Sequence, residues 1–329
     1  MSDPVLPCGA ELFSTTPIPL ARLVSRKVAD GTGRNETALP PALLQDPRLA
    51  CEHSGTGECP RFARHLFGTA EQGKRIQMSD DYELRKAARQ ELARAWRPGE
   101  PLPEISYTPE EDALWETVTA KLRSLHEEVA CASYRRAARN VVLPPDRVPQ
   151  LAEISAVLTA RTGFHLRPAE GTVPIERFLR AFGESGFCAT QYLRSPDSPY
   201  HSPEPDVLHE LVGHAVMLGD PVFADLYRAF GRAARRDITP RRLQEITQVF
   251  WFTMETGVLL EQGGPRVYGA ALLSSVAEME SLAQVDLRPF DVAAILAQDF
   301  DDMHCMPVLF AVESVPRLAA ELDRFLTGS

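Results

Sequence analysis

The sequence predicts a mainly α-helical protein with small β elements, arranged as one large domain. Apolar residues recur at helical spacing in several long segments, whereas only residues 268–273 and 308–312 have the composition of strands. No glycine-rich phosphate loop follows a strand, which argues against a Rossmann or P-loop enzyme. Residues 1–75 have weak hydrophobic periodicity and scattered Pro, Gly, Ser and Thr. We therefore expect an irregular N-terminal extension before a domain that spans residues 76–329.

Four segments carry the helical prediction. Residues 82–96 are rich in Ala, Leu, Arg and Glu, and the stop signal Pro98-Gly99 follows them. The sequence Thr108-Pro-Glu-Glu111 has the form of a capping box with proline at the first helical position. The helix that it opens has one apolar stripe, formed by Leu114, Val118, Leu122, Leu125 and Val129. Two further helices are predicted from apolar residues within 151–158 and 243–250.

Charge and composition exclude several classes of function. The chain has 35 basic and 45 acidic residues, and a net charge of −10 disfavours nucleic acid or an anionic membrane surface as a partner. It lacks the roughly 18 consecutive apolar residues that a spanning helix needs, and it lacks a signal peptide. The six cysteines are scattered, and the Cys51–His53–Cys59 cluster lacks zinc-finger spacing. We expect a cytoplasmic monomer or dimer whose partners are small molecules.

Chemistry is concentrated in the segment Ser202-Pro-Glu-Pro-Asp206-Val-Leu-His209-Glu-Leu-Val-Gly-His214. The prolines predict the start of a helix, with Asp206 in its first turn. His209 and His214 are five positions apart, which separates them by about 140° on an ideal α-helix. Zinc proteases use a spacing of four, so we expect His214 at the end of the helix, where Gly213 permits a bend.

Glu255 is the candidate for a third ligand because it ends an otherwise apolar helical run, Phe250–Glu255. An isolated carboxylate in such a run is costly unless a partner stabilises it, and a metal ion is one such partner. Two histidines and one carboxylate form the facial triad of non-haem iron(II) oxygenases. Other interpretations remain open, since histidine pairs are common in cores and on surfaces. A zinc hydrolase that uses Glu210 as its base is a further alternative.

Five motifs in order resemble the pterin-dependent aromatic amino acid hydroxylases over residues 78–325. The motifs are Thr-Gly-Phe-x-Leu-Arg-Pro at 162–168, Thr-Gln-Tyr-x-Arg at 190–194, Pro-Glu-Pro-Asp-x-x-His-Glu-Leu-x-Gly-His at 203–214, Trp-Phe-Thr-x-Glu at 251–255 and Tyr-Gly-Ala-x-Leu-Leu-Ser-Ser at 268–275. The resemblance implies the single catalytic domain of that family. It also implies ring hydroxylation of a free aromatic amino acid with iron(II), oxygen and a tetrahydropterin.

The resemblance also implies a role for each matching residue. His209, His214 and Glu255 correspond to the iron ligands. Ser274 corresponds to a serine that hydrogen-bonds a ligand histidine, and Glu210 to a residue beside the iron and the pterin. The implied substrate contacts are Arg194 with its partner Asp206 at the amino-acid carboxylate, together with Ser202 and Trp251. The implied pterin contacts are Phe178, which stacks on the ring, and the backbone of Gly171 and Val173.

Several positions depart from the family pattern. Thr256, Cys188 and Phe250 stand where the family usually has Phe, His and Tyr, and His201 replaces a Tyr. We expect several of these near the substrate, so Thr256 is a candidate substrate contact. Asp302 matches the tyrosine-hydroxylating members. We predict L-phenylalanine as the substrate, attacked at the para or meta carbon, with tyrosine and then tryptophan as alternatives. A non-catalytic amino-acid binder is the alternative from another class.

Overall fold

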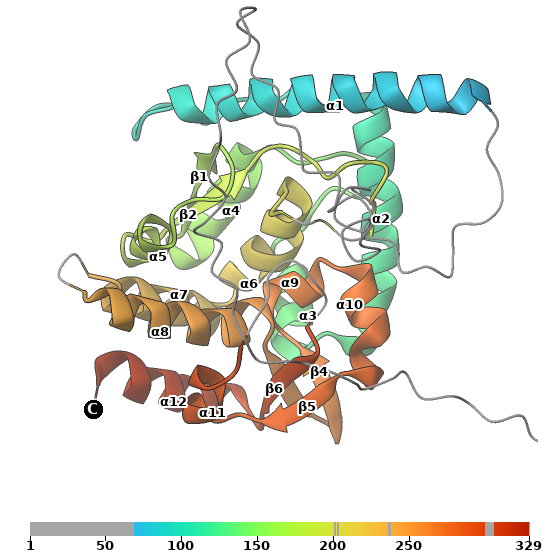
Figure 1. Ribbon diagram of the computed structural model, residues 1–329. Coiled ribbons are helices and arrows are strands. Elements are labelled where there is room, and N and C mark those ends of the chain that lie inside the picture. The colour runs from blue at the N-terminus through green and yellow to red at the C-terminus, as the bar shows by residue number, and fades with distance from the viewer. Residues whose placement is uncertain (1–68, 201, 203, 236–237, 300–305, 329) are drawn as a thin grey trace, which may run out of the picture. The chain divides into compact units, whose positions relative to one another are not determined.

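The computed structural model describes residues 69–200, 202, 204–235, 238–299 and 306–328, and their mainly helical architecture confirms the predicted fold class (Figure 1). No helix among these residues is long and apolar enough to cross a membrane. The longer helices are α1 (Thr69–Ala95), α2 (Pro109–Val129), α4 (Leu151–Thr162), α5 (Ile175–Gly183), α7 (Pro221–Ala233), α8 (Pro240–Phe250) and α12 (Val315–Thr327). The short helices are α3 (Ala132–Ala138), α6 (Val216–Leu218), α9 (Ala270–Leu273), α10 (Val276–Ser281), α11 (Val292–Leu296) and the 3₁₀ turn η4 (Leu282–Gln284).

The predicted helix starts are confirmed where capping residues mark them. The Glu111 N–H donates to Thr108 Oγ1 at 3.3 Å, and the Thr108 N–H donates to Glu111 at 2.9 Å, which completes the capping box of α2. Helix α1 begins at Thr69, well before the predicted residue 82. The Cys51–His53–Cys59 cluster lies outside the described residues. The division of the chain at residue 75 stays a prediction.

The β structure is small and is split into two sheets. Strands β1 (His165–Ala169) and β2 (Gly186–Thr190) pair in parallel. The second sheet has the order β4-β3-β6-β5, with bounds Gly264–Val267, Val258–Glu261, Val308–Val312 and Asp286–Pro289. Strand β6 confirms the prediction for 308–312. The predicted strand 268–273 is wrong. The Tyr268 and Gly269 N–H groups both donate to the Gly257 carbonyl, and α9 starts directly afterwards.

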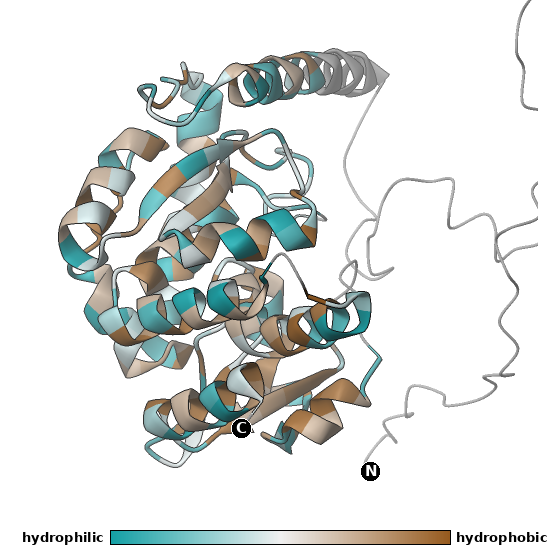
Figure 2. Cartoon of the chain, turned by 90° about the vertical axis from the view of Figure 1, so that its left-hand side faces the viewer, coloured by the Kyte–Doolittle hydropathy of each residue, from teal (hydrophilic) through white to brown (hydrophobic). Residues whose placement is uncertain are grey.

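Two helices cross at close range and bring an aromatic core against the second histidine. A Cβ on Gly231 of α7 would lie 2.0 Å from the Gly183 nitrogen of α5, so this crossing requires glycine. Next to it, Phe182, Phe187 and Tyr227 pack edge-on or stacked, with centroids 5.1–6.4 Å apart. Figure 2 shows hydrophilic and hydrophobic residues alternating along the helices, as expected where each helix buries one face.

Candidate metal centre and substrate site

The two predicted histidine ligands lie on a π-helical segment, η2 (His209–Ala215). A π-helix bonds residue i to residue i+5, so its turns are wider and side chains five apart lie closer to one face than on an α-helix. The Val216 N–H correspondingly donates to the carbonyl of Leu211, five residues earlier. The expectation of a bend at the end of the helix is therefore wrong, because the chain continues as helix into α6. The helix itself starts at Val207, so Asp206 precedes it.

Gly213 serves close packing rather than a bend. A Cβ at this position would lie 2.6 Å from the Ala270 carbonyl oxygen and 2.9 Å from the Ala270 side chain. Glycine thus lets α9 approach the π-helical segment. Ser274 follows α9 directly, and this approach carries its hydroxyl to His209.

Glu255 ends a second π-helical segment, η3 (Trp251–Glu255), which the Thr256 N–H closes by donating to the Trp251 carbonyl at 2.9 Å. His209 Nε2 and His214 Nε2 are 3.1 Å apart. The Glu255 carboxylate lies 3.2 Å from His214 Nε2 and 3.8 Å from His209 Nε2. Ligands that each hold one metal ion at about 2.0–2.2 Å must lie within about 4.4 Å of each other. These three side chains meet that condition.

Hydrogen bonds orient both imidazoles so that Nε2 faces the carboxylate. Ser274 Oγ donates to the Ala270 carbonyl at 2.8 Å, so its lone pairs are available to His209 Nδ1 at 2.9 Å. This arrangement assigns the proton of His209 to Nδ1 and leaves Nε2 with a free lone pair. His214 Nδ1 has the corresponding contact with the Tyr227 hydroxyl at 2.7 Å.

The charge states suit a divalent cation. Burial, reinforced by His214, lowers the pKa of His209 to about 4, which keeps its imidazole neutral at pH 7. Burial alone would raise the pKa of Glu255, but attraction to His214 and His209 outweighs it and lowers that pKa. The set therefore offers the Nε2 atoms of two histidines, one of them held neutral by burial, and one anionic carboxylate. Such a set fits iron(II) in a facial triad.

Arg194 and Asp206 form a buried ion pair beside this centre. Arg194 Nε and Nη2 donate to the two Asp206 oxygens at 3.0 and 2.9 Å, and the side chains are 2% and 0% exposed. Asp206 also accepts from the backbone N–H groups of Arg194 and His209. Burial would raise the pKa of Asp206, but these donors hold it below its usual value. Asp206 thus connects Arg194 to the start of the helix that carries His209 and His214.

Glu210 lies on the π-helical segment η2, next to His209, and its carboxylate contacts the end of strand β2. It accepts from the Thr190 N–H at 3.2 Å and from the Thr190 hydroxyl at 3.4 Å. Burial raises its pKa well above the usual value, and the charges of Glu255 and Asp206 add to the effect. Glu210 is therefore joined to the end of β2 and is not one of the three clustered ligands.

The predicted pterin residues lie one aromatic ring away from the metal centre. The Phe178 ring contacts Phe187 at 5.5 Å, and Phe187 contacts His214 at 4.8 Å between centroids. Val173 and Phe178 are partly exposed, and both pack on a small cluster that includes Cys188. Gly171 is half-buried in the same loop. Cys188 therefore lies with the predicted pterin residues, so the expectation that places it near the substrate is not supported.

The remaining candidate residues have mixed placements. Trp251 is half-buried and its Nε1–H donates to Met306 Sδ at 3.4 Å. Thr256 is 2% exposed and its hydroxyl donates to the Trp251 carbonyl at 2.9 Å, so it acts on Trp251 through the backbone. The Ser202 hydroxyl donates to the Glu204 carbonyl within its own turn. Phe250 belongs to the aromatic core beside Tyr227 and Phe230. Asp302 and His201 lie outside the described residues.

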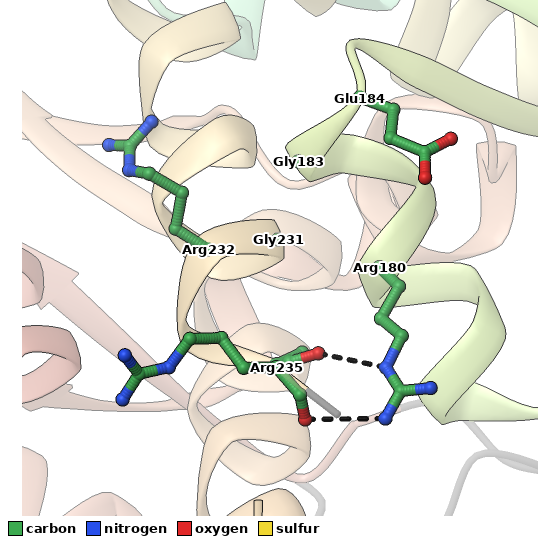
Figure 3. A pocket seen from close by; sticks show the side chains of 7 residues that line it. Arg180, Gly183, Glu184, Gly231, Arg232 and Arg235 are labelled. Carbon is green, nitrogen blue, oxygen red and sulfur yellow. Dashed lines mark hydrogen bonds between the residues drawn. The ribbon is translucent and has the colours of Figure 1, made fainter. Parts of the chain in front are cut away.

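Two surface hollows lie apart from these residues. One, of about 540 Å³, lies between α5 and α7, where Arg180 donates to the carbonyls of Ala234 and Arg235 (Figure 3). The other, of about 630 Å³, is lined by residues of α7, α8 and α12. Neither lining includes a histidine, so the metal-type chemistry lies elsewhere.

Sequence reasoning missed the roles of Tyr227, which bonds a ligand histidine, and of Thr190, which bonds Glu210. Tyr227 lies on α7, thirteen residues after His214, and no local pattern marks it. Thr190 ends β2, and its importance follows only from its two bonds to Glu210. Both contacts depend on tertiary packing. A buried tyrosine on an otherwise apolar helix face was the one available signal, because its hydroxyl needs a partner.

Comparison with known proteins agrees with this geometry. A family described as biopterin-dependent aromatic amino acid hydroxylase matches residues 72–328. The chain is 38% identical over 255 residues to phenylalanine 3-hydroxylase of Streptomyces coeruleorubidus, covering 77% of this chain and 91% of that protein. It is also 38% identical over 239 residues to tyrosine 3-monooxygenase of Bos taurus, covering 71% of this chain and 48% of that protein.

A solved structure has the same fold. Chromobacterium violaceum phenylalanine hydroxylase, with bound iron(III) and the oxidised cofactor 7,8-dihydrobiopterin, superposes with a TM-score of 0.62 at 27% identity. The superposition covers 68% of this chain and 84% of that one. Together with the family match over most of the chain, this similarity shows that the protein is a member of the biopterin-dependent aromatic amino acid hydroxylases.

Proposed function

We propose that this enzyme hydroxylates free L-phenylalanine at the meta carbon of the ring, with iron(II) bound by His209, His214 and Glu255. The observation that carries the metal assignment is the convergence of three donors from two π-helical segments. Support for the substrate comes from the similarity to a phenylalanine 3-hydroxylase over 91% of that protein. Bound iron and tetrahydropterin together supply the oxygen activation that an aromatic ring requires.

The chain's own residues orient and enclose the reactants. Ser274 and Tyr227 hold the two imidazoles with Nε2 turned inward. Arg194 uses four of its five N–H donors on protein oxygens, which leaves one Nη2 hydrogen for the substrate carboxylate among the contacts of the described residues. Trp251 walls the substrate ring, and its position is fixed by Thr256 and Met306. Fixing the carboxylate and the ring together aims one ring carbon at the metal.

The pterin is assigned to the loop of Gly171 and Val173 and to the ring of Phe178. Phe178 is partly exposed, as a stacking platform must be, and it is two ring contacts from His214. These residues would hold the pterin within two ring contacts of a metal ligand. A cofactor and a metal that act together on oxygen require such proximity.

The test is product analysis under defined conditions. The iron-loaded enzyme is supplied with oxygen, tetrahydrobiopterin and one of phenylalanine, tyrosine or tryptophan, and the product is chromatographed against para-tyrosine, meta-tyrosine and dihydroxyphenylalanine. We expect meta-tyrosine from phenylalanine. Turnover with 2-oxoglutarate in place of the pterin would contradict the cofactor assignment.

Tyrosine with attack at its 3-carbon is the second candidate, supported by the similarity to tyrosine 3-monooxygenase. The chain spans about half the length of that relative, whereas it spans nearly all of the phenylalanine 3-hydroxylase. Phenylalanine is therefore preferred. Family membership removes the zinc hydrolase and the non-catalytic binder that the sequence left open.

A further inference from the structure

Helix α1 is anchored to helix α2 at a buried point. Arg89 of α1 donates from both terminal nitrogens to the Glu111 carboxylate at 2.6 and 2.7 Å, and both residues are buried. Arg89 also lies over the Tyr107 ring at 4.7 Å. In the last turn of the helix, Arg94 forms a second, exposed pair with Glu170. Because a bidentate pair fixes both the distance and the orientation of its partners, Arg89 holds this part of α1 against α2 (Figure 1).

One further contact of α1 reaches the segment that carries Asp206. Lys86 Nζ pairs with Glu204, and it lies over the Tyr192 ring at 4.9 Å from the centroid. The Tyr192 hydroxyl donates to the same Glu204 carboxylate at 3.3 Å. The Lys86 side chain is 14% exposed and the Glu204 side chain is 39% exposed, so the pair is partly shielded from water and from salt.

Glu204 and Tyr192 are each two residues before the members of the carboxylate clamp. Two chain segments lie side by side here, since the Val207 N–H donates to the Tyr192 carbonyl at 2.8 Å and the Arg194 N–H to Asp206 at 2.7 Å. Tyr192–Glu204 and Arg194–Asp206 therefore form two successive cross-links between the same segments. The second link lies two positions after the first on both segments.

We propose that Lys86 of α1 is a positioning residue for the amino-acid substrate: through Glu204 and Tyr192 it fixes the segment that presents Arg194 and Asp206 to the substrate carboxylate. This inference rests on the proposed amino-acid site. Lys86 touches neither the substrate nor the metal ligands. Its removal should loosen the clamp while the metal centre, held by Ser274 and Tyr227, keeps its geometry.

The test measures amino-acid binding directly, by calorimetric titration of L-phenylalanine into the anaerobic, iron-loaded enzyme with 7,8-dihydrobiopterin present. Lys86→Met removes the charge and keeps the length of the side chain. We expect its Kd for phenylalanine to rise about two- to fivefold, as expected when a partly exposed charge pair is lost. The Kd of Lys86→Arg should stay within about twofold of that of the unaltered enzyme, because an arginine can also pair with Glu204. Glu204→Gln should raise the Kd for phenylalanine by the same factor as Lys86→Met. Combining the two substitutions should raise the Kd no further, because both remove the same pair.

A matched control separates positioning from general stability. Arg317→Met breaks the Arg317–Glu321 pair on α12, which likewise has one largely buried member, since Glu321 is 16% exposed and Arg317 59%. We expect a similar change in Tm from Arg317→Met and Lys86→Met, but a change in amino-acid Kd from Lys86→Met alone. An unchanged Kd in Lys86→Met would overturn the proposal, as would an equal loss of dihydrobiopterin affinity.

These outcomes are distinct from failure of the proposed substrate. If the unaltered enzyme binds tyrosine and not phenylalanine, the substrate assignment is refuted. The ratio of variant to unaltered Kd, measured with the amino acid that does bind, still decides the role of Lys86.

Discussion

Removing the guanidinium of Arg194 tests the carboxylate clamp most sharply. In Arg194→Gln the Asp206 carboxylate, which is fully buried, loses its only bidentate partner among the described residues and keeps two backbone donors. Breaking a buried ion pair by removing one partner costs about 3–5 kcal/mol. We therefore expect the free energy of unfolding to fall by about that amount, measured by urea denaturation at pH 7.

The same variant should also lose catalytic efficiency. A charge-assisted contact to the substrate carboxylate in a desolvated site is worth about 2–4 kcal/mol, or about 30- to 1000-fold in kcat/KM. Arg194→Gln with Asp206→Asn removes both charges, so it should recover part of the stability and none of the efficiency. Arg194→Lys keeps the positive charge but loses the planar guanidinium that bonds two oxygens at once. Its kcat/KM should lie between those of the unaltered enzyme and of Arg194→Gln. A loss of kcat/KM below about threefold in folded Arg194→Gln would refute the clamp.

Three further predictions concern the metal centre, the regiochemistry and the fold. Ser274→Ala and Tyr227→Phe each remove the partner of a ligand imidazole, so iron affinity in chelator competition should fall about 10- to 100-fold; unchanged affinity would show that these bonds do not orient the ligands. Thr256→Phe removes the bond to the Trp251 carbonyl and adds bulk at a buried position, so the product from phenylalanine should shift from meta- towards para-tyrosine; an unaltered ratio contradicts this account. Burial would raise the pKa of Glu111, but hydrogen bonds from Arg89 and from the Thr108 backbone outweigh it and lower that pKa. The stability that the ionised carboxylate contributes is therefore present above about pH 4.5 and is lost as the pH falls below that value. Glu111→Gln should thus cost about 3 kcal/mol at pH 7 and progressively less below pH 4.5 in urea titrations, and a difference that is independent of pH would contradict the pairing.

The sequence predicted the elements with local signals. The capping box of α2 is local, because Thr108 and Glu111 are each other's partners three residues apart. Strand β6 pairs with the distant strands β3 and β5, but its unbroken apolar run Val308–Val312 already marks a fully buried strand. Strands β1 and β2 have five residues each and pair only across helix α5, whereas β3 and β4 form a hairpin with only four residues in each strand. Such short strands give little periodicity to detect. The predicted strand 268–273 failed because a turn held by the Gly257 carbonyl interrupts it.

The candidate site was predicted as a set of residues but not as a geometry. The five-residue spacing of His209 and His214 looked unfavourable on an α-helix, and the bend assumed to correct it does not exist. A π-helical segment resolves the spacing, and it depends on close packing of α9 against Gly213. The bonds from Tyr227 and Thr190 likewise arise only from tertiary packing. The five-residue spacing, judged on an ideal α-helix, therefore disfavoured the approach of the two histidines that the folded chain shows.

Iron binding by Glu255→Gln, compared with the unaltered chain, tests the central claim most directly. The substitution keeps the size of the side chain and removes the one anionic donor of the cluster. Equilibrium dialysis with iron(II) under nitrogen should give one iron per unaltered chain, and the same preparation should hydroxylate phenylalanine. The Glu255→Gln protein should remain folded, retain little iron and form no product. Full iron occupancy and turnover in Glu255→Gln would contradict the assignment of the metal centre.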